Sequence, residues 1–262
     1  MRKRYRIALA VLLVAVAGVI AWELLRLREP LYQGKALTVW LTPQRYSGTF
    51  DAWQAQVRKA DEAVLRIGSK AVPALLRMLQ AKDSALKVSL INLARRQHII
   101  RIEYTSAAEW HHRARHGFEV LGAQGKSAVP ALIDIANQNI SRTSELDAID
   151  ALGFIGPSAE QAVPSLLRWA TNADSEMRCN AILALGKIHS DPDRVVLALT
   201  NALQDSYVPA RIDALIALQH FGPDAKLAVP ALLEFLKSDN TTRSIDALKA
   251  IDPEAAAKAG VK

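Results

Sequence analysis

AVPALL at 71–76, AVPALI at 128–133, AVPSLL at 162–167 and AVPALL at 228–233 are four copies of one short phrase in this chain of 262 residues. A fifth, degenerate copy, VVLAL at 195–199, fills the remaining place, because Pro164, Leu197 and Pro230 are each 33 residues apart. A period of this length predicts an array of helical repeats. Such arrays offer extended surfaces, so the repeat favours binding over chemistry in a pocket.

Each repeat contains the pattern of two helices. The first ends in a phrase such as ALGFIG at 151–156 or ALQHFG at 217–222, where glycine accepts the left-handed conformation that ends a helix. The second carries the AVP phrase with its proline in the first turn, where a missing amide costs little. Leu75, Leu76 and Leu79 then share one face, which must pack on neighbouring units.

Between the units an aspartate precedes a basic residue. An aspartate can cap the helix that follows it, and a cation along that helix can bond the adjacent turn. The pattern predicts a ladder of polar contacts that holds the repeats in register, not a catalytic set. The pairs are Asp83 with Lys87, Asp174 with Arg178, Asp205 with Arg211 and Asp239 with Arg243.

The first two AVP phrases are 57 residues apart where the period requires 33, so a segment near 84–116 is inserted. Residues 84–97 have the pattern of an amphipathic helix and 98–104 that of a short extended link. Ser106 with Glu109 predicts a capping box that opens a helix to about Leu121.

The inserted segment holds a dense cluster of polar and aromatic side chains. On a helix over 106–121, Glu109, His112 and His116 share a face at a spacing that metal ligands use. The alternative is a solvated helix face with Trp110 packed inward. We favour it and expect no metal, because Arg113 and Arg115 oppose a bound cation. The candidate insertion patch is Arg101, Tyr104, Trp110, His112 and His116.

Two further features have a structural interpretation. GAQGKS at 122–127 is similar to a phosphate-binding loop, but Val120 stands where its first glycine belongs and no strand precedes it, so we interpret it as a turn between helices. Cys179 is the single cysteine, which excludes an internal disulfide. Its apolar neighbours Ile182 and Leu183 indicate a small core residue rather than a nucleophile.

The combined pattern of AVPALL, Asp-x-x-x-Arg and ALGxIG over roughly residues 50–252 resembles HEAT repeats of the phycobilisome-lyase-like kind. YQGKALTVWL at 32–41 and IDPEAAAKAG at 251–260 resemble membrane-anchored or exported HEAT proteins of verrucomicrobial bacteria. The resemblance implies an all-α fold, a right-handed α-α superhelix of the HEAT/ARM-like solenoid type. It also implies that the second helices line the concave side and that the protein takes part in protein–protein assembly.

A surface for a partner is expected four and five residues after each AVP proline, beside the core stripe of the second helices. A column that mixes charge with large apolar side chains suits a groove for a peptide or helix. The equal alternative is that these apolar residues only complete the packing between repeats. The candidates are Arg77, Met78, Asp134, Arg168, Trp169, Glu234 and Phe235, with Ile135, Asn201 and Ala202 at the same two positions of other units.

The N-terminus predicts a membrane segment. MRKRYR precedes Ile7–Trp22, sixteen residues without a charge, which favours an uncleaved signal-anchor with a cytoplasmic N-terminus. A secretory signal, cut at Ala15-Val16-Ala17 or after Ala21, is the second interpretation, and a buried N-terminal helix is the weakest. The protein is then expected as a single-pass inner-membrane protein with a periplasmic solenoid, or as a secreted or periplasmic protein after cleavage.

Charge excludes a nucleic-acid groove. Residues 1–30 hold six basic and two acidic residues, so they supply more than half of the net charge of +7. The remaining chain is only weakly basic, and we therefore expect no nucleic-acid partner.

The predicted organisation is a signal-anchor over 1–30, a linker with a short helix over 31–48, and a solenoid over 49–262 that Asp252, Pro253 and Glu254 close with a capping helix. We expect a non-enzymatic scaffold for an unidentified protein partner, without a cofactor or small-molecule substrate. Two alternatives stay open: an accessory or lyase-like protein that serves a chromophore- or metal-containing enzyme, and reinforcement of the cell envelope.

Overall fold

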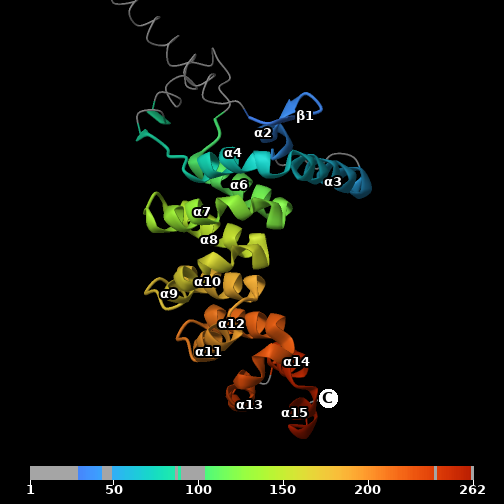
Figure 1. The fold of residues 1–262 in the computed structure, drawn as a ribbon, viewed down its shortest axis with the longest axis vertical. Coiled ribbons are helices and arrows are strands. Elements are labelled where there is room, and N and C mark those ends of the chain that lie inside the picture. The colour runs from blue at the N-terminus through green and yellow to red at the C-terminus, as the bar shows by residue number, and fades with distance from the viewer. Residues whose placement is uncertain (1–28, 43–48, 86–87, 90–103, 239–240, 261–262) are drawn as a thin grey trace, which may run out of the picture.

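The structure, a computed structural model, describes residues 29–42, 49–85, 88–89, 104–238 and 241–260. There the helices stack in consecutive layers of an elongated array (Figure 1). The predicted anchor before Glu29 and residues 90–103 of the predicted insertion lie outside this part of the chain. None of the described helices is long and apolar enough to cross a membrane.

Helices make up most of the array. Two short strands, β1 (Leu31–Tyr32) and β2 (Lys35–Ala36), pair antiparallel near its beginning. The helices with the AVP phrase or its degenerate copy, here named the outer column, are α4 (Val72–Leu79), α7 (Val129–Asn137), α9 (Val163–Trp169), α11 (Pro192–Ala202) and α13 (Val229–Ser238). The inner column consists of α6 (Ala107–Leu121), α8 (Arg142–Ile155), α10 (Ser175–Ile188), α12 (Val208–Phe221) and α14 (Thr242–Ile251). The ends are formed by α2 (Leu37–Trp40), α3 (Phe50–Ile67) and α15 (Pro253–Lys258).

Short 3-10 turns connect an inner helix to the next outer helix. They begin at a glycine whose φ is positive, as at Gly156 (φ 67°) and Gly222 (φ 49°), and they lead to a proline near the start of the AVP helix. The predicted helix ends and proline positions are thus confirmed. The turns are η1 (Gly68–Ala71), η2 (Gly122–Ala128), η3 (Gly156–Ala162) and η4 (Gly222–Ala228).

The degenerate unit makes this connection differently. His189 takes the left-handed conformation (φ 50°, ψ 51°) where other units have glycine, and Asp191 does the same directly before Pro192. The His189 ring stacks on Phe221 with the ring centroids 4.4 Å apart. A non-glycine residue in this conformation is strained, and the stacking contact of the imidazole helps to hold it.

Each outer helix packs on the inner helix that follows it, α7 on α8, α9 on α10 and α11 on α12. The prediction that a unit begins with the Ala-Leu-Gly helix and ends with the AVP helix is therefore wrong by one helix. Glycine and proline mark where helices end, but they do not show which neighbour a helix packs on.

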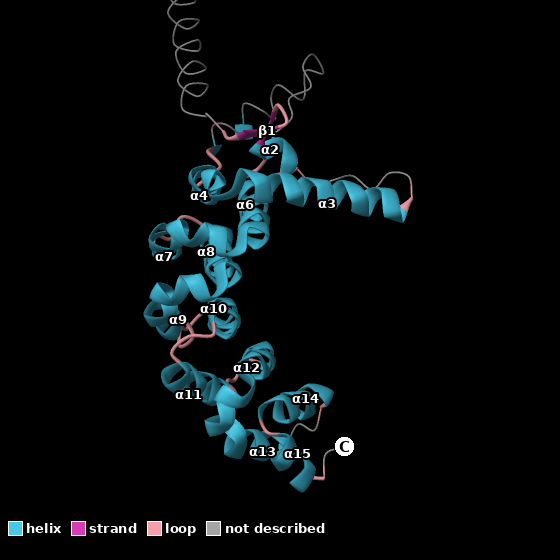
Figure 2. Ribbon diagram, turned by 45° about the vertical axis from the view of Figure 1, so that its right-hand side comes forward, coloured by secondary structure: helices cyan, strands magenta, loops and turns pink. Residues whose placement is uncertain are grey.

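The array is curved, and Figure 2 shows that the inner column lies on its concave side. Successive inner helices pack directly on one another, from α6 to α14, whereas the outer helices are more widely spaced. The expectation that the AVP helices line the concave side is wrong. Small residues let the inner helices approach: a Cβ on Gly186 would lie 2.7 Å from the Cα of Ala217, and one on Gly153 3.1 Å from the Cα of Ala184.

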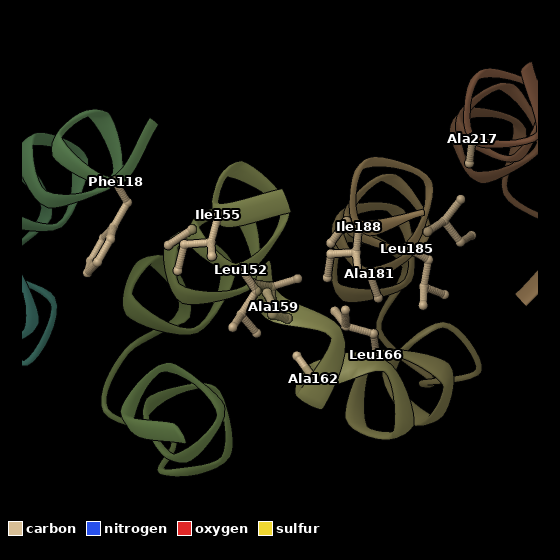
Figure 3. Close-up of a cluster of buried hydrophobic side chains, with 14 of the residues drawn as sticks. Phe118, Leu152, Ile155, Ala159, Ala162, Leu166, Ala181, Leu185, Ile188 and Ala217 are labelled. Carbon is tan, nitrogen blue, oxygen red and sulfur yellow. The ribbon is translucent and has the colours of Figure 1, made fainter. Parts of the chain in front are cut away.

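The core lies between the two columns. Figure 3 shows Leu152 and Ile155 of α8, Leu185 and Ile188 of α10, and Leu166 from the outer column, with Ile155 on the side of Phe118. All six are almost completely buried. Each layer thus buries its apolar stripe against its neighbours, as a stacked repeat requires.

The polar ladder between units is present. As predicted, the cations bond the adjacent turns, since Arg178 donates to the carbonyl oxygen of Asn172 and Arg211 to that of Asp205, both at 2.9 Å. The ion pairs, by contrast, join residues one unit apart. Asp174 caps α10 by accepting from the amide of Met177 at 2.9 Å, and its carboxylate also binds Arg142 of the preceding layer. Arg178 donates twice to the carboxylate of Asp205, each time at 2.8 Å. The ladder therefore links consecutive layers, while Lys87 and Asp239 lie outside the described residues.

The two ends of the array are closed by short elements. Asp252 caps α15 by accepting from the amide of Ala255 at 2.9 Å, with Pro253 in the first turn, which confirms the predicted capping helix. At the other end, part of the segment expected as a linker folds onto α3 as the β1–β2 hairpin and α2.

Candidate functional site

The inner column presents its solvent side as a grid of side chains. Residues 33 apart on α8, α10, α12 and α14 occupy the same place in successive layers. One row, here the polar row, is Asp147, Asn180, Asp213 and Asp246. The adjacent row, here the mixed row, is Asp150, Leu183, Ile216 and Lys249. We name this grid the inner surface.

At the α6–α8 end, the inner surface is dominated by ion pairs. Arg115 Nε donates to Asp150 at 2.7 Å and lies 3.8 Å from Asp147. Burial raises the pKa of Asp147 to about 6, and the charge of Asp150 adds to this rise while Arg115 opposes it. The ring of Phe154 is covered by Arg115 at 5.1 Å and by Lys187 at 4.2 Å. Together these ion pairs and ring contacts join side chains of α6, α8 and α10, so they extend over three layers.

Toward α10 and α12, the inner surface becomes more apolar. Leu183 and Ile216 are partly exposed and do not belong to the buried core cluster, in contrast to Leu185 and Leu218 on the same helices. They lie beside Asn180 and Asp213 of the polar row. This half thus offers apolar contact area next to a carboxylate.

The chemistry of Cys179 fits a structural residue. Burial, together with a hydrogen bond to Asp213, raises the pKa of its thiol to about 12. A thiol with such a pKa stays protonated at neutral pH, and the thiolate is the nucleophilic form. The pKa of Asp213 is itself raised by burial.

His111 is a residue that sequence reasoning missed. It is completely buried, with Nε2 2.9 Å from the carbonyl oxygen of Ala81 and Nδ1 2.8 Å from Thr143 Oγ1. The carbonyl only accepts, so Nε2 carries the proton and Nδ1 accepts from the hydroxyl. Burial lowers the pKa of His111, which favours the neutral ring. Helical spacing is the signal that could have found it, because His111 lies four residues after Ala107 and seven before Phe118, which are both buried on α6.

The other residues of the insertion patch are spread out. Tyr104 donates to Asp83, which also accepts from the amide of Ala107 at 3.0 Å. His112 is exposed, Trp110 is half-buried under the Arg113 guanidinium at 5.1 Å, and Arg101 lies outside the described residues.

The metal-ligand spacing does not assemble a site. His116 lies 3.1 Å from Asp61 on α3, while Glu109 accepts from Arg113 at 3.0 Å. Within the described ranges, no group of three or more His, Cys, Asp or Glu side chains is placed to hold a metal ion. Ser106 caps α6 as predicted, but with Glu109 turned to Arg113 the structure shows only this half of the capping box. GAQGKS forms the turn η2 between α6 and α7, as interpreted from the sequence.

The predicted partner column lies on the outer helices, away from the inner surface. Its apolar members Met78, Ile135, Trp169 and Phe235 are buried, so for them the packing alternative holds. Its charged members Arg77, Asp134, Arg168 and Glu234 are exposed, and Arg168 donates to Asn137 at 3.1 Å.

Part of this column lines two grooves at the edge where outer helices end. One groove, of about 440 Å³, contains Arg178, Asn201 and Ala202. The other, of about 550 Å³, contains the equivalent Arg211, Glu234 and Phe235 one unit further on. In the first groove the guanidinium of Arg178 is already paired with the carboxylate of Asp205.

The stacked pairs of helices define an α-helical repeat protein of the solenoid class. A family model for HEAT repeats matches residues 129–219 and, in an overlapping second match, residues 163–252. Residues 129–252, somewhat less than half of the chain, are therefore similar to HEAT repeats. The two matches begin at Val129 and Val163, the first residues of α7 and α9, in agreement with units that start at the AVP helix.

Among solved structures, the chain is similar to a designed armadillo repeat protein in complex with the peptide (KR)4, at 16% identity and a TM-score of 0.48, over 85% of this chain and 97% of that one. A second designed armadillo repeat protein is 16% identical with a TM-score of 0.46, over 86% and 98% of the two chains. No curated protein sequence matches the chain. The resemblance to phycobilisome-lyase-like and verrucomicrobial proteins stays a prediction.

Proposed function

We propose that this protein is a non-catalytic scaffold that binds a protein partner on its inner surface and is held at the bacterial inner membrane by residues 1–28. The observation that carries the proposal is the mixed row, where Leu183 and Ile216 remain partly exposed although the layers around them are fully packed. Two apolar side chains outside the core in adjacent layers, rimmed by polar ones, form a patch that a partner can cover.

The chemistry of the partner follows from the two rows. Leu183 and Ile216 can contact apolar side chains of a partner. Asp213 and Asp246, one layer apart on α12 and α14, can bind basic ones. The partner is therefore expected to be a segment that carries apolar and basic side chains along one face. The membrane tether rests on the sequence of residues 1–28, with its basic start and uncharged run.

Site-specific photo-crosslinking in the native host tests this function. A photoreactive residue in place of Ile216 is expected to give one discrete adduct, which Leu183→Glu in the same chain removes. The matched control is the same residue in place of Leu197, which is 61% exposed on the outer column. Equal adducts from both positions, or an adduct that survives Leu183→Glu, would contradict a partner site on the inner surface.

A further inference from the structure

The N-terminal cap, defined as residues 29–42, presents apolar side chains away from the array. Tyr32 packs on the core and lies against Trp40 with ring centroids 6.2 Å apart. Leu31, its neighbour in β1, must point to the opposite side because side chains alternate along a strand, and it is 68% exposed. In α2, Leu37 and Trp40 face the core, whereas Val39 is 51% exposed.

The point where the chain enters the cap is fixed. Glu29 Oε2 accepts from the amide of Thr38 at 3.0 Å and from its hydroxyl at 2.8 Å. The carbonyl oxygen of Pro30 accepts from the amide of Leu37 at 3.1 Å. Glu29 through its side chain and Pro30 through its backbone thus bind the start of α2.

The linker between the cap and the predicted membrane segment is short. The uncharged run ends at Trp22, and six residues, 23–28, separate it from Glu29, with Leu24, Leu25 and Leu27 among them. Each residue of extended chain spans at most about 3.6 Å, so the cap lies within about 25 Å of the end of the uncharged run. If that run spans a bilayer, the cap stays close to the lipid headgroups.

Large apolar side chains are exposed in two stretches of the described chain. In the N-terminal part these are Leu31, Val39, Leu65 and Phe50, which is 56% exposed at the start of α3. Further along the array they are Leu197, Tyr207, Val208 and Leu227. Of all these, Leu31 and Val39 are the nearest in sequence to the predicted membrane segment.

We propose that the N-terminal cap rests on the membrane, with Leu31 and Val39 in the boundary between headgroups and acyl chains and Phe50 near it. A peripheral contact of this kind gains from buried apolar area, and Lys35, exposed at the hairpin, adds attraction to anionic lipids. The solenoid is then held against the bilayer by its first layer and does not move freely on a tether. This inference rests on the proposed membrane tether.

Lipid-depth quenching in the full chain tests the inference. In a Cys179→Ser background, single cysteines replace Val39, Leu31 or, as the matched control, Leu227, which is 72% exposed far along the array. Each carries an environment-sensitive dye in vesicles of phosphatidylcholine and phosphatidylglycerol with a spin label near the headgroup. We expect quenching several-fold stronger at positions 39 and 31 than at 227.

Alkaline carbonate extraction of the same vesicles separates the two proposals. If the protein stays in the membrane but positions 31, 39 and 227 are quenched equally, the contact of the cap is wrong and the tether stands. If carbonate removes the protein, the tether itself is wrong. A further variant, Leu31→Glu with Val39→Glu, keeps the fold because both side chains point to solvent, and it is expected to reduce the quenching of a dye at Phe50→Cys to the level of the control.

Discussion

The middle of the array and its N-terminal junction are held together in different ways. Between α8, α10 and α12, glycine and alanine bring backbones into contact, as at Gly186 against Ala217. At the junction of α4, α6 and α8, buried polar side chains bind the end of α4: His111 reaches the carbonyl oxygen of Ala81, and Ser144 donates to that of Leu79 at 2.5 Å.

The difference shows what a break in the period costs. A regular repeat can place a small residue at the same spot in every layer, and the helices then pack closely. The inserted segment interrupts this register after α4, so the last carbonyl groups of α4 need partners from other elements. Buried polar groups make the packing at this junction specific, because each one needs a hydrogen bond from a particular neighbour.

The largest effect is expected from filling the close contact in the middle of the array. In Gly186→Val the added side chain meets the Cα and Cβ of Ala217, both 2.7 Å from the new Cβ, and the backbone must move apart. We expect a loss of about 3 kcal/mol in the free energy of unfolding, measured by urea denaturation.

Gly153→Ala is the matched control for this site, because its Cβ would lie 3.1 Å from the Cα of Ala184 and needs only a small shift. Its loss in the free energy of unfolding is expected to be clearly smaller than that of Gly186→Val. Similar losses for the two variants would show that the helix spacing adapts and that the small residues do not set it.

The polar junction is tested by His111→Ala. The substitution removes a completely buried imidazole and its hydrogen bonds to the carbonyl oxygen of the half-buried Ala81 and to the hydroxyl of Thr143. We expect a loss of about 2–3 kcal/mol in the free energy of unfolding, with faster amide hydrogen exchange at the end of α4. His111→Gln, which can still donate to the carbonyl, is expected to lose less.

This junction also makes stability depend on pH. Since burial lowers the pKa of His111 below its usual 6.5, the folded state binds a proton less readily than the unfolded one. The stabilisation of the folded state by neutral His111 is therefore complete above about pH 6.5 and is lost as the pH falls below it. A pH dependence that stays unchanged in His111→Gln would contradict this assignment.

The polar row offers a substitution that is expected to stabilise. With a pKa raised to about 6, Asp147 destabilises the folded state once it is ionised, so its effect grows as the pH rises from about 4 to 6. Asp147→Asn gives this position the same residue as Asn180, its equivalent in the next layer. The free energy of unfolding is expected to rise by about 1 kcal/mol at pH 7, measured by thermal unfolding. Asp246→Asn, exposed in the same row, is the control and is expected to change little. A gain that is equal at pH 4 and pH 7 would argue against ionisation as the cause.

The repeat period predicts most of the fold but little of the surface that we assign to binding. It predicted the stack of helices, their ends and the capping helix, because glycine, proline and apolar spacing act locally. It did not show that the Ala-Leu-Gly helices form the concave side, since curvature depends on how closely Gly153 and Gly186 let neighbouring helices approach. The residues of the polar row are 33 apart in the sequence, but the period alone does not mark them as part of a surface.

The smallest effect concerns Cys179, where the middle of the array places a thiol against a carboxylate. With a pKa of about 12, the thiol is expected to react with maleimide far more slowly than a free thiol at pH 8, followed by mass spectrometry of the intact protein. Asp213→Asn removes the negative charge that helps to raise this pKa, so labelling is expected to become faster, whereas Asp246→Asn leaves it unchanged. Because burial is the largest cause, the reaction in Asp213→Asn is expected to remain slower than that of a free thiol. Full reactivity in this variant would show instead that the layers α10 and α12 open at this position, and that the middle of the array is less firmly packed than its N-terminal junction.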